Sequence, residues 1–329
     1  MSGSNWRFGV GDVAPPGTKA QGFVAWGDPV LDGAGLQWPF TAIHGAHPGP
    51  AALVLAGVHG SEYPSIDAAL RLAAETDPAD VNGQILCLPL LNPAAFWGRV
   101  AYVAPADNVN PNRAYPGKPD GTFSERLAHH VTRKGITRAD CVIDLHGGDL
   151  PEALVPFSIY IESGNAEVDR KSRALAEAFG LEGLMVHRAE RAPIAGTTYA
   201  AAALNGVPAI IAEDGGAGYY DPAVGHRMLR GLRNALRSVG VLSGAAEAMP
   251  KPRVYRGGFT WLRSKEAGFF RPAVKVGDEV KAGRKLGTMF DLFGRAIEEI
   301  ATPDTGRVLF IVVSPAIAKD GLICGVGVD

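Results

Sequence analysis

An apolar run that ends in a histidine and a glutamate three residues apart is the feature that most constrains this chain. In the stretch Leu53-Val-Leu-Ala-Gly-Val-His59-Gly-Ser-Glu62, a strand-like pattern stops at His59, and an alanine-rich helical pattern follows Glu62. An imidazole nitrogen and a carboxylate oxygen at the end of a strand are two of the three protein ligands that a catalytic zinc ion requires. We expect the third at the end of a neighbouring strand, where His146 in Ile143-Asp-Leu-His146-Gly-Gly is the candidate.

Size and composition favour a globular protein with room for two domains. The chain has 329 residues, of which 47% are hydrophobic and 20% are charged. Its net charge of −2 gives no reason to expect a nucleic acid or an anionic membrane as partner. The N-terminal residues show neither the basic start nor the apolar core of a secretory signal peptide. No apolar run reaches the length of a membrane span. The three cysteines, Cys87, Cys141 and Cys324, lie in apolar surroundings, as expected for free buried thiols in a reducing compartment. We therefore expect a soluble cytoplasmic protein.

Short apolar runs alternate with helical patterns through most of the chain. The strand-like runs are residues 51–57, 84–90, 140–145, 155–161 and 207–212. A capping box opens a helix at Thr122, Asn165 is the expected cap of a second helix that ends before Gly180, and Asp221-Pro222 opens a third. This alternation predicts an α/β fold in which helices cover both faces of a sheet. Functional residues of such sheets gather at the carboxyl ends of the strands, where His59 and His146 fall.

The pattern changes after about residue 243. A stretch rich in Ala and Pro at 243–253 looks like a linker, and short strand-like pieces separated by turn signals follow it. We expect a catalytic α/β domain at 1–245 and a small all-β domain at 246–329. The turn signals of the second domain, such as Val276-Gly-Asp-Glu and Pro303-Asp-Thr-Gly306, resemble those of a lipoyl or biotinyl carrier barrel. Phe293-Gly-Arg295 stands where a carrier would hold its modified lysine, so we interpret this domain as a lid that shapes the mouth of an active site.

The surroundings of the three candidate ligands strengthen the zinc interpretation. Pro64 suits the first turn of a helix, so Glu62 is expected near the positive end of that helix, which favours its ionised form. Three protein ligands, His59, Glu62 and His146, leave a fourth position for water, whose pKa zinc lowers to about 7. We expect Asp144, two residues before His146, to face the opposite side of the strand, with orientation of a ligand as the weaker alternative.

A zinc hydrolase also needs a group that moves protons. Glu213 ends an apolar strand and precedes two glycines, and burial there would raise its pKa into the useful range. Asp214 is the rival and is expected to face the other way.

An arginine beside amide side chains in a Pro-bounded loop suits a substrate carboxylate, and so Asn112 and Arg113 are candidate substrate-binding residues. Asn110 is expected to form a turn, and His187 has no acid at ligand spacing, so we give it no role.

Taken together, these motifs resemble the succinylglutamate desuccinylase/aspartoacylase family, zinc deacylases related to the metallocarboxypeptidases. The matching stretches are Gly57-Val-His59-Gly-Ser-Glu62, Asn92-Pro-Ala-Ala-Phe96, Asn110-Pro-Asn112-Arg113-Ala-Tyr-Pro-Gly117, Asp144-Leu-His146-Gly147 and Glu213-Asp-Gly-Gly216. The resemblance implies a mixed sheet like that of zinc carboxypeptidases, one Zn²⁺ per chain on His59, Glu62 and His146, Glu213 as the catalytic group, and Asn112 and Arg113 on the substrate carboxylate. Many members have a further arginine eleven positions before the motif's arginine. That position holds Tyr102 here, and we take Arg99, the nearest arginine, as its substitute.

The leading hypothesis is a zinc-dependent amidohydrolase that removes an acyl group from a small N-acyl amino acid. Zinc-bound water would attack the acyl carbonyl, with Glu213 as general base and then general acid. Two alternatives stay open: a carboxypeptidase-like peptidase, and a noncatalytic ligand-binding protein of the same fold. The sequence does not fix the acyl group, the amino acid or the oligomeric state, and a homo-oligomer is among the options.

Overall fold

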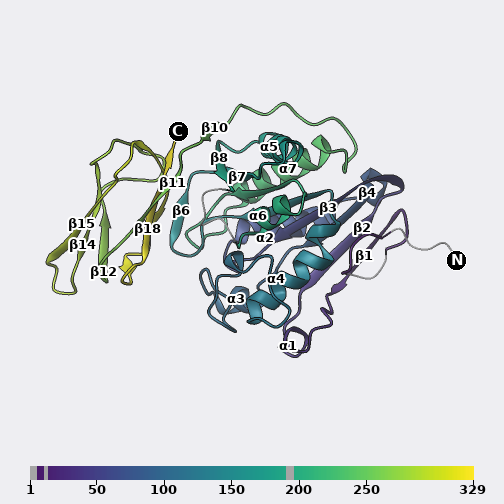
Figure 1. Ribbon diagram of the computed structural model, residues 1–329, viewed down its shortest axis with the longest axis horizontal. Helices are drawn as coiled ribbons and strands as arrows, with labels where there is room; N and C mark the ends of the chain where they lie inside the picture. Colours follow the sequence, from purple (N-terminus) through teal and green to yellow (C-terminus); the bar gives the residue numbers. More distant parts are fainter. Residues whose placement is uncertain (1–5, 11–13, 190–195) are drawn as a thin grey trace.

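The computed structural model describes residues 6–10, 14–189 and 196–329, and its main body is one nine-stranded sheet. The strands follow the spatial order β1-β2-β4-β3-β5-β9-β7-β8-β10 (Figure 1). The central pairs β4–β3, β3–β5 and β5–β9 are parallel, whereas β7 runs antiparallel to β9, so the sheet is mixed, as predicted. In chain order the strands are β1 (Thr18–Phe23), β2 (Pro39–His44), β3 (His47–Ala56), β4 (Asn82–Leu88), β5 (Cys141–His146), β7 (Phe157–Glu162), β8 (Gly183–Arg188), β9 (Ala209–Glu213) and β10 (Arg253–Tyr255).

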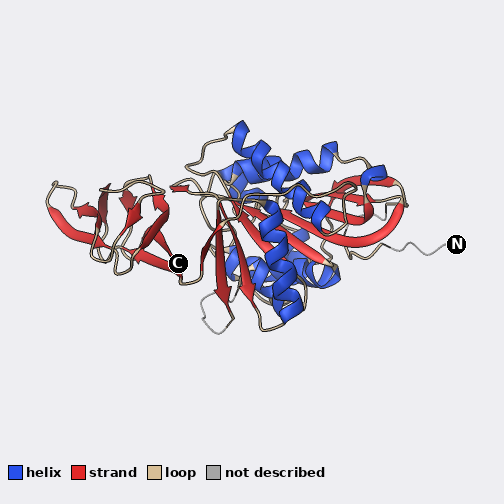
Figure 2. Cartoon of the chain, turned by 90° about the horizontal axis from the view of Figure 1, so that it is seen from above, coloured by secondary structure: helices blue, strands red, loops and turns tan. Residues whose placement is uncertain are grey.

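Helices cover both faces of this sheet (Figure 2). Alternate residues of β3 point to opposite faces, so Leu53 and Leu55 belong to one apolar core and Val54 to the other. The first core is closed by α4 (Phe123–Lys134) and α6 (Thr198–Leu204), and the second by α2 (Tyr63–Glu75), α5 (Ala166–Phe179) and α7 (Pro222–Ser238). Two short helices, α1 (Pro29–Asp32) and α3 (Pro93–Gly98), complete this part of the chain. Strands buried on both faces explain why the central runs are continuously apolar rather than alternating.

The predicted helix ends are confirmed. Thr122 and Glu125 form a reciprocal capping box at the start of α4. The Asn165 side chain caps α5, whose last turn ends at Gly180 in the left-handed region with φ 80°. Asp221 caps α7. These caps satisfy backbone N–H groups that the helix itself leaves unpaired, which is why they can be recognised from the sequence.

The rest of the chain forms two smaller antiparallel sheets beside the main one (Figure 1). One has the order β11-β18-β16-β13 and the other β15-β14-β12-β17. A three-residue strand of the main body, β6 (Glu152–Leu154), pairs with β16, and β10 pairs with β8 in the main sheet, so strands cross the expected boundary at residue 245 in both directions. The bounds are β11 (Gly258–Arg263), β12 (Gly268–Pro272), β13 (Glu279–Val280), β14 (Lys285–Phe290), β15 (Ala296–Ala301), β16 (Gly306–Val312), β17 (Ala316–Ile317) and β18 (Leu322–Val328).

The three cysteines are buried, in agreement with their apolar sequence contexts. Cys87, Cys141 and Cys324 are buried and form no disulfide. None of the helices in the described part of the chain is both long and apolar enough to cross a membrane.

Candidate metal centre and active site

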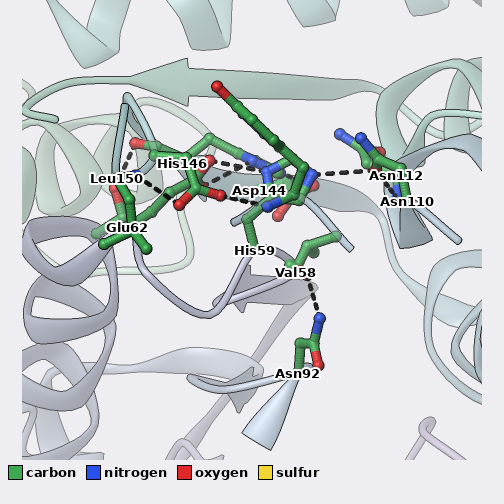
Figure 3. Close-up of polar contacts among 12 residues, drawn as sticks. Val58, His59, Glu62, Asn92, Asn110, Asn112, Asp144, His146 and Leu150 are labelled. Atoms are coloured by element: carbon green, nitrogen blue, oxygen red, sulfur yellow. Dashed lines mark hydrogen bonds and ion pairs between the residues drawn. The ribbon is translucent and has the colours of Figure 1, made fainter. Parts of the chain in front are cut away.

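Three side chains from separate parts of the chain converge at the carboxyl end of the central strands. His59 lies in the loop after β3, Glu62 is the residue from which α2 begins, and His146 is the last residue of β5. One ligand atom from each residue lies within 4.8 Å of the other two. Figure 3 shows the three side chains turned toward one another. The structure therefore brings together the set that the sequence pattern selected.

The contacts within this cluster suit a divalent cation. His59 Nδ1 lies 2.7 Å from one carboxylate oxygen of Glu62, and His146 Nδ1 lies 3.0 Å from the other. Burial alone would raise the pKa of Glu62, but the two imidazoles lower that pKa to about 2. The carboxylate is thus ready to bind a cation without first losing a proton. Two imidazole nitrogens and one carboxylate oxygen, all buried, form a donor set that zinc accepts.

The second nitrogen of each histidine is held by another side chain. His59 Nε2 lies 3.1 Å from Asn110 Oδ1, and His146 Nε2 lies 2.9 Å from Asp144 Oδ2. The Thr198 hydroxyl donates to the same Asp144 oxygen. Such contacts fix the orientation and tautomer of a metal-binding histidine. Asn110 also forms the expected turn by accepting from the backbone N–H of Asn112.

The expectation that Asp144 faces away from His146 is wrong. Side chains alternate along a strand with period two, so residues 144 and 146 of β5 lie on the same face. The weaker alternative, a carboxylate that orients the ligand, is the one that the geometry supports.

Replacing Asp144 with asparagine is expected to weaken zinc binding 10- to 100-fold while leaving the fold intact. Asparagine has the same shape but no charge, so it holds the ring of His146 less firmly and makes its ligating nitrogen less basic. Competition with a chelator of known zinc affinity measures the change. Unchanged zinc affinity in Asp144→Asn would show that this carboxylate only fills space in the core.

Glu213 ends β9, and its Cα is paired in register with that of His146 on the adjacent parallel strand. Its side chain lines the pocket described below, on the same face of the sheet as Ile211. Burial raises the pKa of Glu213 well above its usual range; Glu62 and Glu152 add to that rise, and His146 opposes it. Asp214, by contrast, is buried in a two-point ion pair with Arg227 of α7, at 2.6 and 2.8 Å. The ion pair with Arg227 engages the Asp214 carboxylate, and of these two neighbouring acids Glu213 is the one that lines the pocket.

Two residues of this candidate metal site, His59 and Glu62, line a pocket of about 960 Å³. Asn112 and Arg113, in the turn at Pro111–Arg113, both line it. The Asn112 amide oxygen accepts from the backbone N–H of Thr198 at 3.0 Å, which ties this turn to the start of α6. Arg99 does not line the pocket; it is exposed at the end of α3.

Several pocket residues escaped the sequence reasoning. His187 lies 2.6 Å from the Tyr199 hydroxyl, and burial together with nearby Arg113 lowers the pKa of His187 to about 4, so it is neutral at physiological pH. No acid at ligand spacing marks this histidine, and only the fold reveals its position. The other unforeseen lining residues include Tyr102 and Glu152 from the main body and Arg256, Phe259, Trp261, Arg263 and Phe310 from the C-terminal part.

Fold and site together define a mixed α/β protein with a candidate metal site at the carboxyl end of its central strands. A family model for the succinylglutamate desuccinylase/aspartoacylase catalytic domain matches residues 48–239, more than half of the chain. The chain therefore belongs to the succinylglutamate desuccinylase/aspartoacylase family and is a hydrolase. Among curated relatives, it is 30% identical over 249 residues to the N-alpha-acetyl-L-2,4-diaminobutyric acid deacetylase of Halomonas elongata, covering 74% of this chain and 71% of that protein.

Solved structures extend the likeness over almost the whole chain. The product-bound structure of the ectoine utilization protein EutE (DoeB) from Ruegeria pomeroyi matches with a TM-score of 0.83 and 25% identity, over 97% of this chain and 99% of that one. A succinylglutamate desuccinylase/aspartoacylase from Rhodobacter sphaeroides matches with a TM-score of 0.78 and 25% identity, over 94% and 95% of the two chains. The resemblance thus includes the C-terminal sheets as well as the catalytic part.

Proposed function

We propose that this protein is a zinc-dependent deacylase that hydrolyses the amide bond of small N-acyl amino acids. The observation that carries the proposal is the position of Glu213, a buried acid on the strand next to His146, in the pocket that also holds His59 and Glu62. Binding alone would not require such an acid. Family membership and the deacetylase from Halomonas elongata support the same reaction.

Each residue has a role that follows from its place. A zinc ion held by His59, Glu62 and His146 would polarise the acyl carbonyl and lower the pKa of a water molecule to about 7. Glu213 takes a proton from the attacking water and later gives it to the leaving amine. Its raised pKa suits both transfers, because the group must exchange a proton near neutral pH. Asp144 and Asn110 keep the two imidazoles in place.

The substrate carboxylate is proposed to bind at Arg113. This arginine lines the pocket and is close enough to Arg263 of the C-terminal part for the two charges to repel, and burial lowers the pKa of Arg113. An anion between the two guanidinium groups would relieve that repulsion and accept charge-assisted hydrogen bonds. Asn112 lines the same pocket and is proposed to help position the carboxylate.

Arg113→Ala is expected to raise KM for the substrate by about 10- to 100-fold, because a hydrogen bond to a charged group contributes roughly 1.5–3 kcal/mol. The value of kcat should change much less, since Arg113 holds the substrate rather than the reacting atoms. Arg99→Ala is the matched control: it removes an exposed arginine outside the pocket. Steady-state kinetics on both variants decides the matter, and an equal rise of KM in Arg99→Ala would restore Arg99 as a substrate-binding residue.

The C-terminal sheets favour the deacylase over a peptidase. Residues of this part, including Arg256, Phe259 and Trp261, form one wall of the pocket, which narrows the space that an extended peptide chain would need. We also propose a cytoplasmic location, which the free buried cysteines support.

The decisive experiment combines metal analysis with a substrate panel. Purified protein loaded with zinc should contain one equivalent of the metal and release acetate or succinate from at least one member of a panel of N-acetyl and N-succinyl amino acids. The panel should include the Nα-acetylated 2,4-diaminobutyrate on which the Halomonas relative acts. C-terminal release from peptides without any deacylation would favour the peptidase, and stoichiometric zinc with no turnover of any compound would favour a binding protein.

A further inference from the structure

Five aromatic rings form one wall of the pocket. The ring of Phe259 lies at their centre, and its centroid is 5.0 to 6.0 Å from those of the other four, Phe157, His187, Trp261 and Phe310. All five residues line the pocket, and we call them the aromatic wall. The first two lie in the main sheet, on β7 and β8, whereas the other three lie on β11 and β16 of a C-terminal sheet. Neither the candidate metal site nor the proposed proton transfer uses any of them.

A glycine of the C-terminal sheet makes room for two of these rings. Gly325 of β18 is paired in register with Trp261 on one neighbouring strand and with Phe310 on the other. A Cβ on Gly325 would overlap the Phe310 ring. Because the glycine has no side chain, the two rings approach to 5.3 Å between centroids. Glycine inside a strand is otherwise unfavourable, so the rings that it admits explain its place here.

The aromatic wall presents apolar surface to the pocket. Phe157 and Phe310 are buried, but Phe259 is half-buried and Trp261 is 44% exposed. The pocket volume of about 960 Å³ is at the upper end of the range of about 300–1,000 Å³ in which proteins bind small ligands. Removing apolar surface from water is favourable, so this part of the pocket would stabilise an apolar group of a bound substrate.

Printed contacts connect the aromatic wall to the turn that is proposed to bind the substrate carboxylate. Asn112 Oδ1 in this turn accepts from the backbone N–H of Thr198 at 3.0 Å. The hydroxyl of the next residue, Tyr199, lies 2.6 Å from Nδ1 of His187. The His187 ring in turn packs edge-to-face against Phe259, with an angle of 64° between the planes. The α-carbon of an amino acid carries both the carboxylate and the side chain, so the side chain is the part of the substrate that can reach the wall.

We propose that the aromatic wall binds the side chain of the substrate, so that the preferred substrates are N-acyl derivatives of amino acids with large apolar or aromatic side chains. This inference rests on the proposed deacylase function. The substrate carboxylate lies at Arg113, the acyl group faces the candidate metal site, and the side chain packs on Phe259 and Trp261. An ammonium group there would meet the like charges of Arg256 and Arg263, which line the same pocket, so derivatives of diamino acids are disfavoured.

The test compares four compounds on zinc-loaded wild-type protein. They are Nα-acetylphenylalanine, Nα-acetylalanine, Nα-acetyl-2,4-diaminobutyrate and N-phenylacetylalanine, which carries the phenyl ring in its acyl group instead. The value of kcat/KM for Nα-acetylphenylalanine is expected to exceed that for Nα-acetylalanine by about 10- to 100-fold, the range for burial of one apolar side chain. The other two compounds are also expected to be poorer substrates than Nα-acetylphenylalanine.

Replacing Trp261 tests the wall itself. In Trp261→Ala the preference for Nα-acetylphenylalanine over Nα-acetylalanine is expected to fall by about 3- to 10-fold, mainly through KM, because one aromatic contact is lost and the others remain. Trp261→Phe should keep most of the preference. Trp97→Ala is the matched control and should leave the preference unchanged, because Trp97 is 78% exposed and is not among the described residues that line the pocket. Zinc content and circular dichroism confirm that each variant is folded and loaded.

The outcomes separate the two proposals. If wild-type protein hydrolyses none of the four compounds, the proposed deacylase function fails and this inference fails with it. If it hydrolyses them but does not prefer Nα-acetylphenylalanine to the alanine and diaminobutyrate derivatives, the role of the aromatic wall is overturned while the function stands. A preference for N-phenylacetylalanine would place the apolar group on the acyl side and overturn the assignment to the side chain. An equal loss on every substrate in Trp261→Ala would show a purely structural role and overturn it as well.

Discussion

Glu213→Gln is expected to bind zinc normally and to lose at least two decades of kcat on its best substrate. Glutamine has nearly the same shape but cannot accept a proton, and general acid–base catalysis by a placed side chain contributes about 10²- to 10⁴-fold. Zinc binding should survive because the ligand atoms belong to His59, Glu62 and His146. Metal content and steady-state rates on the same preparation give both halves of the result.

The pH dependence provides a second readout of the same residue. Glu213 works as a base only when deprotonated, so the rate rises with pH as this carboxyl loses its proton. Burial raises the pKa of Glu213, which moves the rise to higher pH than for an exposed glutamate. In Glu213→Gln the residual activity should lose that rise. A variant that keeps full activity, or keeps the wild-type pH profile at a lower rate, would contradict the assignment of Glu213 as the base.

His146→Ala is expected to abolish zinc binding and, with it, activity beyond detection. The substitution removes one ligand and leaves the Glu62 and Asp144 carboxylates without the imidazole that lies between them. A buried acceptor without its donor costs roughly 1–3 kcal/mol, so the variant should also unfold at a lower temperature. Equilibrium dialysis against zinc, with circular dichroism on the same samples, separates metal loss from unfolding.

A comparison with other substitutions sharpens this test. Asp144→Asn should fall between the wild type and His146→Ala in zinc affinity, because it loosens a ligand without removing one. Stoichiometric zinc with wild-type affinity in a folded His146→Ala protein would rule out the three-residue site.

The sequence predicted the central strands of the main sheet and the helix caps better than the strands near the two ends of that sheet. The central strands are continuously apolar, and the helix caps at Thr122, Asn165 and Asp221 use side chains that leave a local signal. Strands β1, β2, β8 and β10 were not foreseen. They lie toward the two ends of the sheet, where short length and mixed polarity weaken the pattern.

In the candidate site, too, some residues could be predicted from the sequence and others could not. His59, His146 and Glu213 each end or directly follow an apolar run, and Glu62 stands at the start of the next helix, so their positions could be inferred from the ends of these elements. The partners that hold them depend on contacts between distant segments, such as Thr198 with Asp144. No sequence pattern indicates that Glu152 lines the pocket. It lies in a strand of three residues, and the strand with which this one pairs lies about half the chain away in sequence.

The pairing of β6 with β16 has a consequence for how this protein can be divided. Truncation near residue 245 would strip the main sheet of β10, expose the free edge of β6 and open one wall of the cavity. An unpaired strand edge invites self-association. Residues 1–245 are therefore not expected to fold correctly when produced alone. Exchanging the C-terminal part between relatives would also exchange residues that line the pocket.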